Sequence, residues 1–90
     1  MSIFVKAIEQ LEEAKPPREV TFRYAVEVGR GLRDSYRTAI KDRVFLMGLT
    51  IDIDEDRGWF SSSYRIAVSG MSDALSRFLR WLAEVERLNA

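Results

Sequence analysis

Four carboxylates lie close together and are the first group in this sequence that could do chemistry. Asp52, Asp54, Glu55 and Asp56 all fall within one short segment, and the alternating spacing of the aspartates is typical of the start of a calcium-binding loop. A complete loop of that class also needs glycine at its sixth position and an acid at its twelfth, where this chain has Arg57 and Ser63. We therefore interpret the segment as a solvated turn, and the sequence predicts no metal and no other cofactor.

Catalytic residues are hard to find in this chain. It contains no histidine and no cysteine, so the three hydroxyls of Ser61–Ser63 lack the base that usually activates a serine nucleophile. Gly29-Arg30-Gly31 has neither the spacing nor the downstream lysine of a phosphate-binding loop. We predict that the protein is not an enzyme.

Basic residues form a candidate binding surface. If the strands proposed below are correct, five of them lie on the outward face of one sheet together with a tryptophan: Arg23, Arg33, Arg37, Lys41, Arg65 and Trp59. Arginine binds phosphate through two hydrogen bonds, and tryptophan stacks on bases. Glu27 and Asp52 dilute the charge of the same face. Binding of single-stranded nucleic acid, or of another anionic partner, is therefore our second hypothesis for function.

The overall charge sets a limit on that second hypothesis. Lys and Arg number 14, Asp and Glu also number 14, and 47% of the 90 residues are hydrophobic. A neutral chain lacks the broad positive field of a protein that coats nucleic acid without sequence preference. The length predicts one domain over residues 1–90. No signal peptide and no apolar run long enough to cross a membrane is seen, so we expect a cytoplasmic protein without membrane contact.

Two elements at the start of the chain have clear periodicity. Residues 3–14 carry apolar side chains at three- and four-residue spacing, which predicts a helix that ends before Pro16-Pro17. Residues 19–28 alternate between apolar and other side chains, which predicts a strand with one buried face. The inward residues of that strand are Val20, Phe22, Tyr24, Val26 and Val28.

Residues 32–43 are ambiguous. As a helix, Leu32, Tyr36 and Ile40 share an apolar stripe with Ala39. As a strand that follows a turn at Gly29–Gly31, the same three residues face the core of a hairpin, and Glu27 lies opposite Arg33 in a favourable cross-strand pair. We favour the strand, and the helix remains the alternative.

Residues 44–53 and 59–69 predict a second hairpin, in which Ile53 lies opposite Phe60 and Phe45 opposite Val68. A last helix follows from an N-cap at Ser72 to about residue 87. The expected fold is α+β, with two helices packed on one face of an antiparallel sheet in the order α-β-β-β-β-α. The fallback order is α-β-α-β-β-α.

The apolar stripe of the last helix is unusually wide. Ala74, Trp81 and Leu88 flank its main apolar positions, and one face of a sheet does not need so broad a surface. Apolar surface left over in this way indicates association with another protein. Our leading hypothesis is a small non-enzymatic cytoplasmic binding protein, an adaptor, inhibitor or regulatory subunit that forms a homodimer through these residues. Such a compact chain is also compatible with an origin in a phage or another mobile element.

One short segment is similar to a known structural unit. Residues 64–79, which join an alternating strand through Gly70 to an amphipathic helix, resemble the strand–glycine–helix corner of ferredoxin-like modules, including the membrane-anchored assembly proteins of type IV pili. The resemblance implies an α+β corner at this place. It carries no set of functional residues, so it implies no activity.

Overall fold

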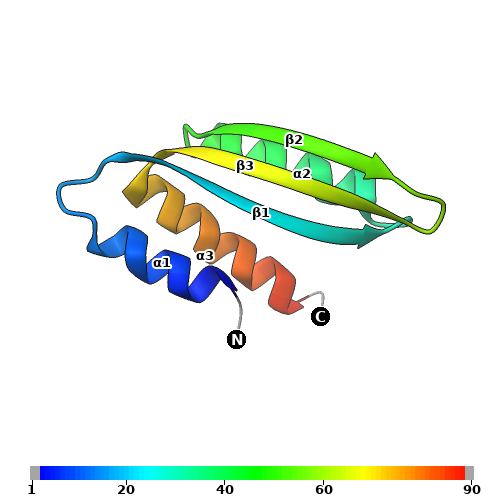
Figure 1. The fold of residues 1–90 in the computed structure, drawn as a ribbon, viewed down its shortest axis with the longest axis horizontal. Coiled ribbons are helices and arrows are strands. Elements are labelled where there is room, and N and C mark those ends of the chain that lie inside the picture. Colours follow the sequence, from blue (N-terminus) through cyan, green and yellow to red (C-terminus); the bar gives the residue numbers. More distant parts are fainter. Residues whose placement is uncertain (1–2, 89–90) are drawn as a thin grey trace.

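The chain forms six elements, which the computed structural model describes over residues 3–88 (Figure 1). In order they are α1 (Ile3–Glu13), β1 (Glu19–Gly29), α2 (Arg33–Leu46), β2 (Thr50–Arg57), β3 (Ser61–Met71) and α3 (Ser72–Leu88). The α+β class and the antiparallel sheet are confirmed. The preferred order α-β-β-β-β-α is wrong, because residues 33–46 form a helix, and the fallback order is the one observed.

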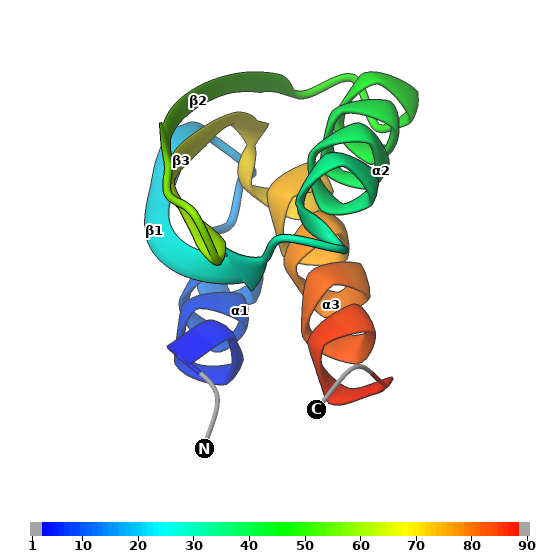
Figure 2. The same ribbon diagram turned by 90° about the vertical axis from the view of Figure 1, so that its right-hand side faces the viewer.

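The sheet has three strands in the order β1-β3-β2, and β3 is antiparallel to both of its neighbours. Tyr24 and Ile53 both lie opposite Ile66, one from each side. Side chains alternate as a strand requires, so even-numbered residues of β1 and β3 point inward. The sheet curls around the helices, and all three helices lie on its concave side (Figure 2). The prediction of two helices on this face is therefore also wrong.

The helix α2 ends in a way that explains why the strand prediction failed. Gly48 has a φ of 70°, a left-handed conformation that glycine adopts without a steric penalty. The Leu49 N–H donates to the Val44 carbonyl at 3.0 Å, and the Gly48 N–H donates to the Phe45 carbonyl at 3.2 Å. These two bonds make a Schellman motif, which closes a helix at its C-terminus. The proposed pairing of Phe45 with Val68 does not exist, because Phe45 belongs to this helix.

The second hairpin forms with a different register from the one predicted. Ile53 lies opposite Ile66, not Phe60, and Ile51 lies opposite Val68. The turn is at Gly58–Phe60, so the acidic segment expected to be a turn is part of strand β2. Ile51 and Ile53 of this strand face inward, as the alternation requires, and Glu55 and Arg57, which continue that side, meet α2 as described below.

The helix α3 lies at the centre of the core, which accounts for its wide apolar stripe. Its main apolar residues Leu75, Phe78, Leu79 and Leu82 are completely buried. Phe4 of α1 also packs into this core, against the rings of Phe22 and Tyr24 on β1. Helix α1 packs along one side of α3, where Glu12 and Arg80 form an ion pair.

On the other side of α3, Trp81 contacts α2 through the Arg43 guanidinium, 4.8 Å from the Trp81 ring centre. The two flanking residues proposed as a dimer surface, Ala74 and Trp81, are partly buried and pack against the core. The side chain of Leu88 lies outside the described part of the structure. The surplus width of the stripe is thus used within the chain, by α1 and α2.

Candidate binding surfaces

The outward face of the sheet does not form the predicted basic surface. Of the proposed residues, only Arg23 and Arg65 lie there, and Arg65 is paired with Asp54 at 3.2 Å. In the described strands this face also carries five acids: Glu19, Glu27, Asp52, Asp54 and Asp56. Its charge is therefore acidic overall. Arg33, Arg37 and Lys41 lie on α2, on the other side of the sheet, because their segment is helical.

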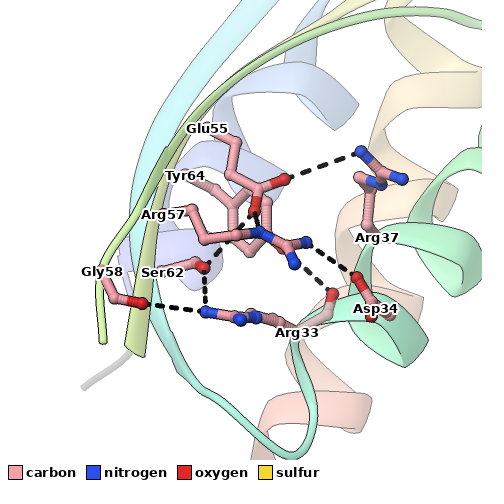
Figure 3. Close-up of polar contacts among 8 residues, drawn as sticks. All are labelled: Arg33, Asp34, Arg37, Glu55, Arg57, Gly58, Ser62 and Tyr64. Carbon is pink, nitrogen blue, oxygen red and sulfur yellow. Dashed lines mark hydrogen bonds and ion pairs between the residues drawn. The ribbon is translucent and has the colours of Figure 1, made fainter. Parts of the chain in front are cut away.

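Two of these α2 arginines belong to a polar cluster between α2 and the inward face of β2 and β3 (Figure 3). Arg33 donates to the Gly58 carbonyl at 3.0 Å and to the Ser62 hydroxyl at 3.3 Å. Arg37 lies 3.6 Å from a carboxylate oxygen of Glu55. The Tyr64 hydroxyl donates to the Arg33 carbonyl at 3.0 Å. Both arginines are thus engaged within the chain.

Glu55 is the centre of this cluster. Its side chain is 14% exposed and accepts a 2.8 Å hydrogen bond from Arg57, which also bonds Asp34 of α2 at 2.9 Å. The hydrogen bond from Arg57 and the nearby charges of Arg57 and Arg37 hold the pKa of Glu55 below its usual value, against a smaller opposing effect of desolvation. We infer that the cluster fixes the first half of α2 on the sheet.

A change of Glu55 to glutamine tests that role. Because the folded-state pKa of Glu55 lies below the unfolded one, its ionised form stabilises the fold above the unfolded pKa of about 4.3. This stabilisation is lost as the pH falls through the folded-state pKa. We expect Glu55→Gln to lower the free energy of unfolding near neutral pH and to have little effect in strong acid, as measured by urea titrations across that range. Asp56→Asn is the matched control, because Asp56 lies on the outward face of the same strand. An equal loss for Glu55→Gln at both ends of the range would contradict an electrostatic role.

The turn between β2 and β3 exposes two large aromatic side chains, which we call the tip pair: Trp59 and Phe60, 74% and 81% exposed. Their ring centres are 6.5 Å apart in an edge-to-face arrangement. The Arg30 N–H donates to the Phe60 carbonyl at 2.9 Å, and the Arg30 guanidinium lies 5.5 Å from the centre of the Trp59 ring. Trp59 is thus exposed, as expected, but it stands at the end of the sheet rather than on its face.

A second exposed apolar pair lies at the opposite end of α2. Phe45 and Leu46 occupy its last turn and are 84% and 75% exposed. The first turn of α2 is tied to the tip of the hairpin through Arg33 and Gly58. The two exposed pairs are therefore separated by the length of the helix, about 20 Å for its residues.

A cleft of about 600 Å³ opens between α2 and α3, beside the end of β1. Apolar side chains that include Ile40, Trp81 and Val85 line most of it. Polar groups enter it from Tyr36 and Glu86. The hydroxyl of Tyr36 lies 3.3 Å from that of Tyr24.

Several residues of these surfaces were missed in the sequence. Glu55 and Arg57 continue the inward alternation of Ile51 and Ile53. A predicted strand that continued to residue 57 would therefore have placed both side chains on the inward face. The helical alternative for residues 32–43 would then have supplied Arg33 and Arg37 as partners for Glu55. Glu86 gave no signal, because its place in the cleft depends on how α2 and α3 are arranged.

Within residues 3–88, no three metal-ligating side chains come close enough together to hold a metal ion. In the same part of the chain, no helix is long and apolar enough to cross a membrane. A comparison of the sequence with family models and curated proteins, and of the fold with solved structures, finds no match.

Proposed function

We propose that this chain is a small non-enzymatic binding protein of the cytoplasm that acts through protein–protein contacts, as an adaptor, inhibitor or regulatory subunit. The tip pair carries the proposal. Two neighbouring aromatic side chains that are 74% and 81% exposed leave a large apolar area in water, and burial of that area against a partner is favourable. Tryptophan and arginine, here Trp59 beside Arg30, are also the residue types that most often dominate binding energy.

The local geometry favours binding because the tip is already ordered. The Gly58 N–H donates to the Ser61 carbonyl at 2.8 Å, and the bond from Arg30 to Phe60 ties the turn to the end of β1. A partner therefore does not have to order this backbone when it binds, which reduces the entropic penalty of association. The chemistry of the tip suits a partner with an apolar pocket and a hydrogen-bond acceptor for Arg30.

Self-association remains part of the proposal, at a different surface. Ala74 and Trp81 are packed within the chain, so we transfer the proposed homodimer contact from α3 to the tip pair. The nucleic-acid hypothesis has less support, because the outward sheet face carries more acids than arginines and such a face repels phosphates. Arg30 and Trp59 remain a place where a base could stack, so nucleic acid is one outcome of the test below.

Photo-crosslinking at two positions tests the function. We would place benzoylphenylalanine at position 60, or at position 45 as the matched control, and irradiate each protein in an extract of its native host. We expect a discrete, nuclease-resistant protein adduct at position 60 that is absent at position 45. With that partner purified, Trp59→Ser should weaken binding at least about tenfold, as for other interface hot spots, and Phe45→Ser should not.

The other results of that experiment are equally informative. An adduct of twice the mass of the chain identifies a second copy as the partner, and light scattering on the purified protein would check it. An adduct that nuclease removes favours nucleic acid and contradicts the protein-binding proposal. Equal adducts at both positions would mean that any exposed aromatic residue is captured, which also contradicts it.

A further inference from the structure

The cleft between α2 and α3 is separate from the tip pair and has the properties of a ligand site. Its volume of about 600 Å³ lies within the range of about 300–1,000 Å³ for small-molecule pockets. Most of its wall is apolar, and a few polar groups converge in it, which is the usual composition of such sites. Ile40 contributes from α2, and Trp81 and Val85 contribute from α3.

The charge of the cleft is negative. Glu86 lines it, and none of the described residues that line it is a lysine or an arginine. Glu27 also lines it, but its side chain lies on the outward face of the sheet. Glu27 already accepts a 2.7 Å hydrogen bond from the Ser61 hydroxyl. Among the side chains that the structure describes, the Glu86 carboxylate has neither an ion-pair partner nor a hydrogen-bond partner. Glu86 also stands in the last turns of α3, where the helix carbonyls add negative potential that favours a cation.

The surroundings of Glu86 make the charge of its carboxylate costly. Partial burial raises the pKa of Glu86 above its usual value. The Glu86 charge in turn contributes to raising the pKa of both Tyr24 and Tyr36, which burial raises most strongly. No cation of the described residues compensates for this carboxylate. A cationic ligand would do so, and its own charge would be favoured by the same field.

We propose that this cleft binds a small organic cation, a protonated amine or amidine on an aromatic or aliphatic body. The cationic group pairs with Glu86 and donates a hydrogen bond to the Tyr36 hydroxyl oxygen, and the body packs against Ile40 and Trp81. The guanidinium of Arg43 already covers one face of the Trp81 ring at 4.8 Å, so the charge of the ligand is directed to Glu86 and not to that ring. The proposal does not depend on the tip pair.

Three probes of similar shape and different charge test this proposal: phenethylamine, phenethyl alcohol and phenylacetate. The chain has two tryptophans, so a Trp59→Phe background leaves Trp81 in the cleft as the only fluorescent reporter of its kind. We expect phenethylamine to change the Trp81 emission in a saturable way and to bind at least about tenfold more tightly than the alcohol, a difference typical of a charge-assisted contact. Phenylacetate should bind more weakly than both.

Variants assign that preference to Glu86. Glu86→Gln should abolish the tenfold preference for the amine, and Glu84→Gln, at an exposed position of the same helix, should keep it. The preference should also decrease as the pH falls, beginning above the usual glutamate pKa of about 4.3, because protonation of Glu86 removes its charge. Among the described side chains, Tyr24 and Tyr36 are the titratable groups that interact with Glu86, and both stay neutral in this range.

We expect Glu86→Gln to fold, because it removes a partly buried charge whose pKa is raised by burial. Circular dichroism would check the fold. The proposal is wrong if the amine and the alcohol bind equally, if no probe saturates at millimolar concentration, or if Glu86→Gln keeps the preference for the amine. None of these results bears on the photo-crosslinks at position 60, so the two proposals can fail separately.

Discussion

Phe78→Ala should lower the free energy of unfolding by about 3–5 kcal/mol, the usual effect of removing a phenylalanine from a packed core. Phe78 is completely buried in the middle of α3, and its ring centre lies 5.8 Å from that of Trp81. The cavity left by the ring would be bordered by helix and sheet, which cannot both collapse into it. A domain of this size is stable by only about 5–15 kcal/mol, so the variant should unfold at a much lower urea concentration.

Phe60→Ala is the matched control for that experiment. The same side chain is removed, but at a position 81% exposed, so the free energy of unfolding should change by no more than about 0.5 kcal/mol. Urea titrations followed by circular dichroism would measure both variants. Similar losses for the two would mean that the tip pair is part of the core, and the proposed binding surface would then not exist.

Ile40→Ala should lower the free energy of unfolding by about 2–5 kcal/mol. Ile40 is 1% exposed and is one of two α2 residues that are buried in the core. Phe45→Ala, five residues later in the same helix, should have an effect within about 0.5 kcal/mol, because Phe45 is 84% exposed.

This pair of variants separates the two interpretations of residues 32–46. If the segment were a strand, Phe45 would face Val68 in the core, and its loss would be at least as harmful as that of Ile40. In the helix, Ile40 and Val44 face the core and Phe45 faces away from it. A larger loss for Phe45→Ala than for Ile40→Ala would therefore contradict the helix.

The polar cluster connects these energetic predictions with the proposed ligand site. Helix α2 forms one wall of the cleft, and its position depends on Ile40 and Val44 in the core and on Arg33 and Arg37 at the sheet. The shape of the cleft therefore depends on the contacts that hold α2 against the core and the sheet. Variants of Glu55 could change ligand binding by displacing α2. Their fold should therefore be checked before their ligand binding is compared with that of Glu86→Gln.

Local periodicity was sufficient to predict the elements whose apolar side chains fit only one kind of secondary structure. The helix over residues 3–13, the strand over residues 19–29 and the helix over residues 72–88 lie close to where their patterns placed them. In each case, the apolar side chains recur with one period. The first helix ends before Pro16, the strand ends at Gly29, and the last helix begins shortly after Gly70. The inward residues Tyr64, Ile66 and Val68 of β3 are also as expected.

Residues 32–49 were not determined in this way, because their pattern satisfies both periods. Leu32, Tyr36 and Ile40 fall on one side of a strand and also on one side of a helix. The available local signal was Gly48, which ends the helix in a left-handed conformation. A glycine also occurs within strands, so this signal did not rule out the strand. Three residues assigned to the first strand of the second hairpin also belong to α2. The register of that hairpin was wrong for another reason, because its turn lies at Gly58–Phe60 and not in the acidic segment before it.

The candidate sites show the same division between local and long-range information. By itself, the sequence determined which groups are present: no histidine or cysteine for catalysis, a tryptophan at position 59, and acidic and basic residues in equal number. Only the tertiary structure decided which of them remain available, because packing of α1 and α2 on α3 covers Trp81 and the polar cluster engages Arg33 and Arg37. The same packing opens the cleft around Glu86, where neighbours distant in the chain determine its burial.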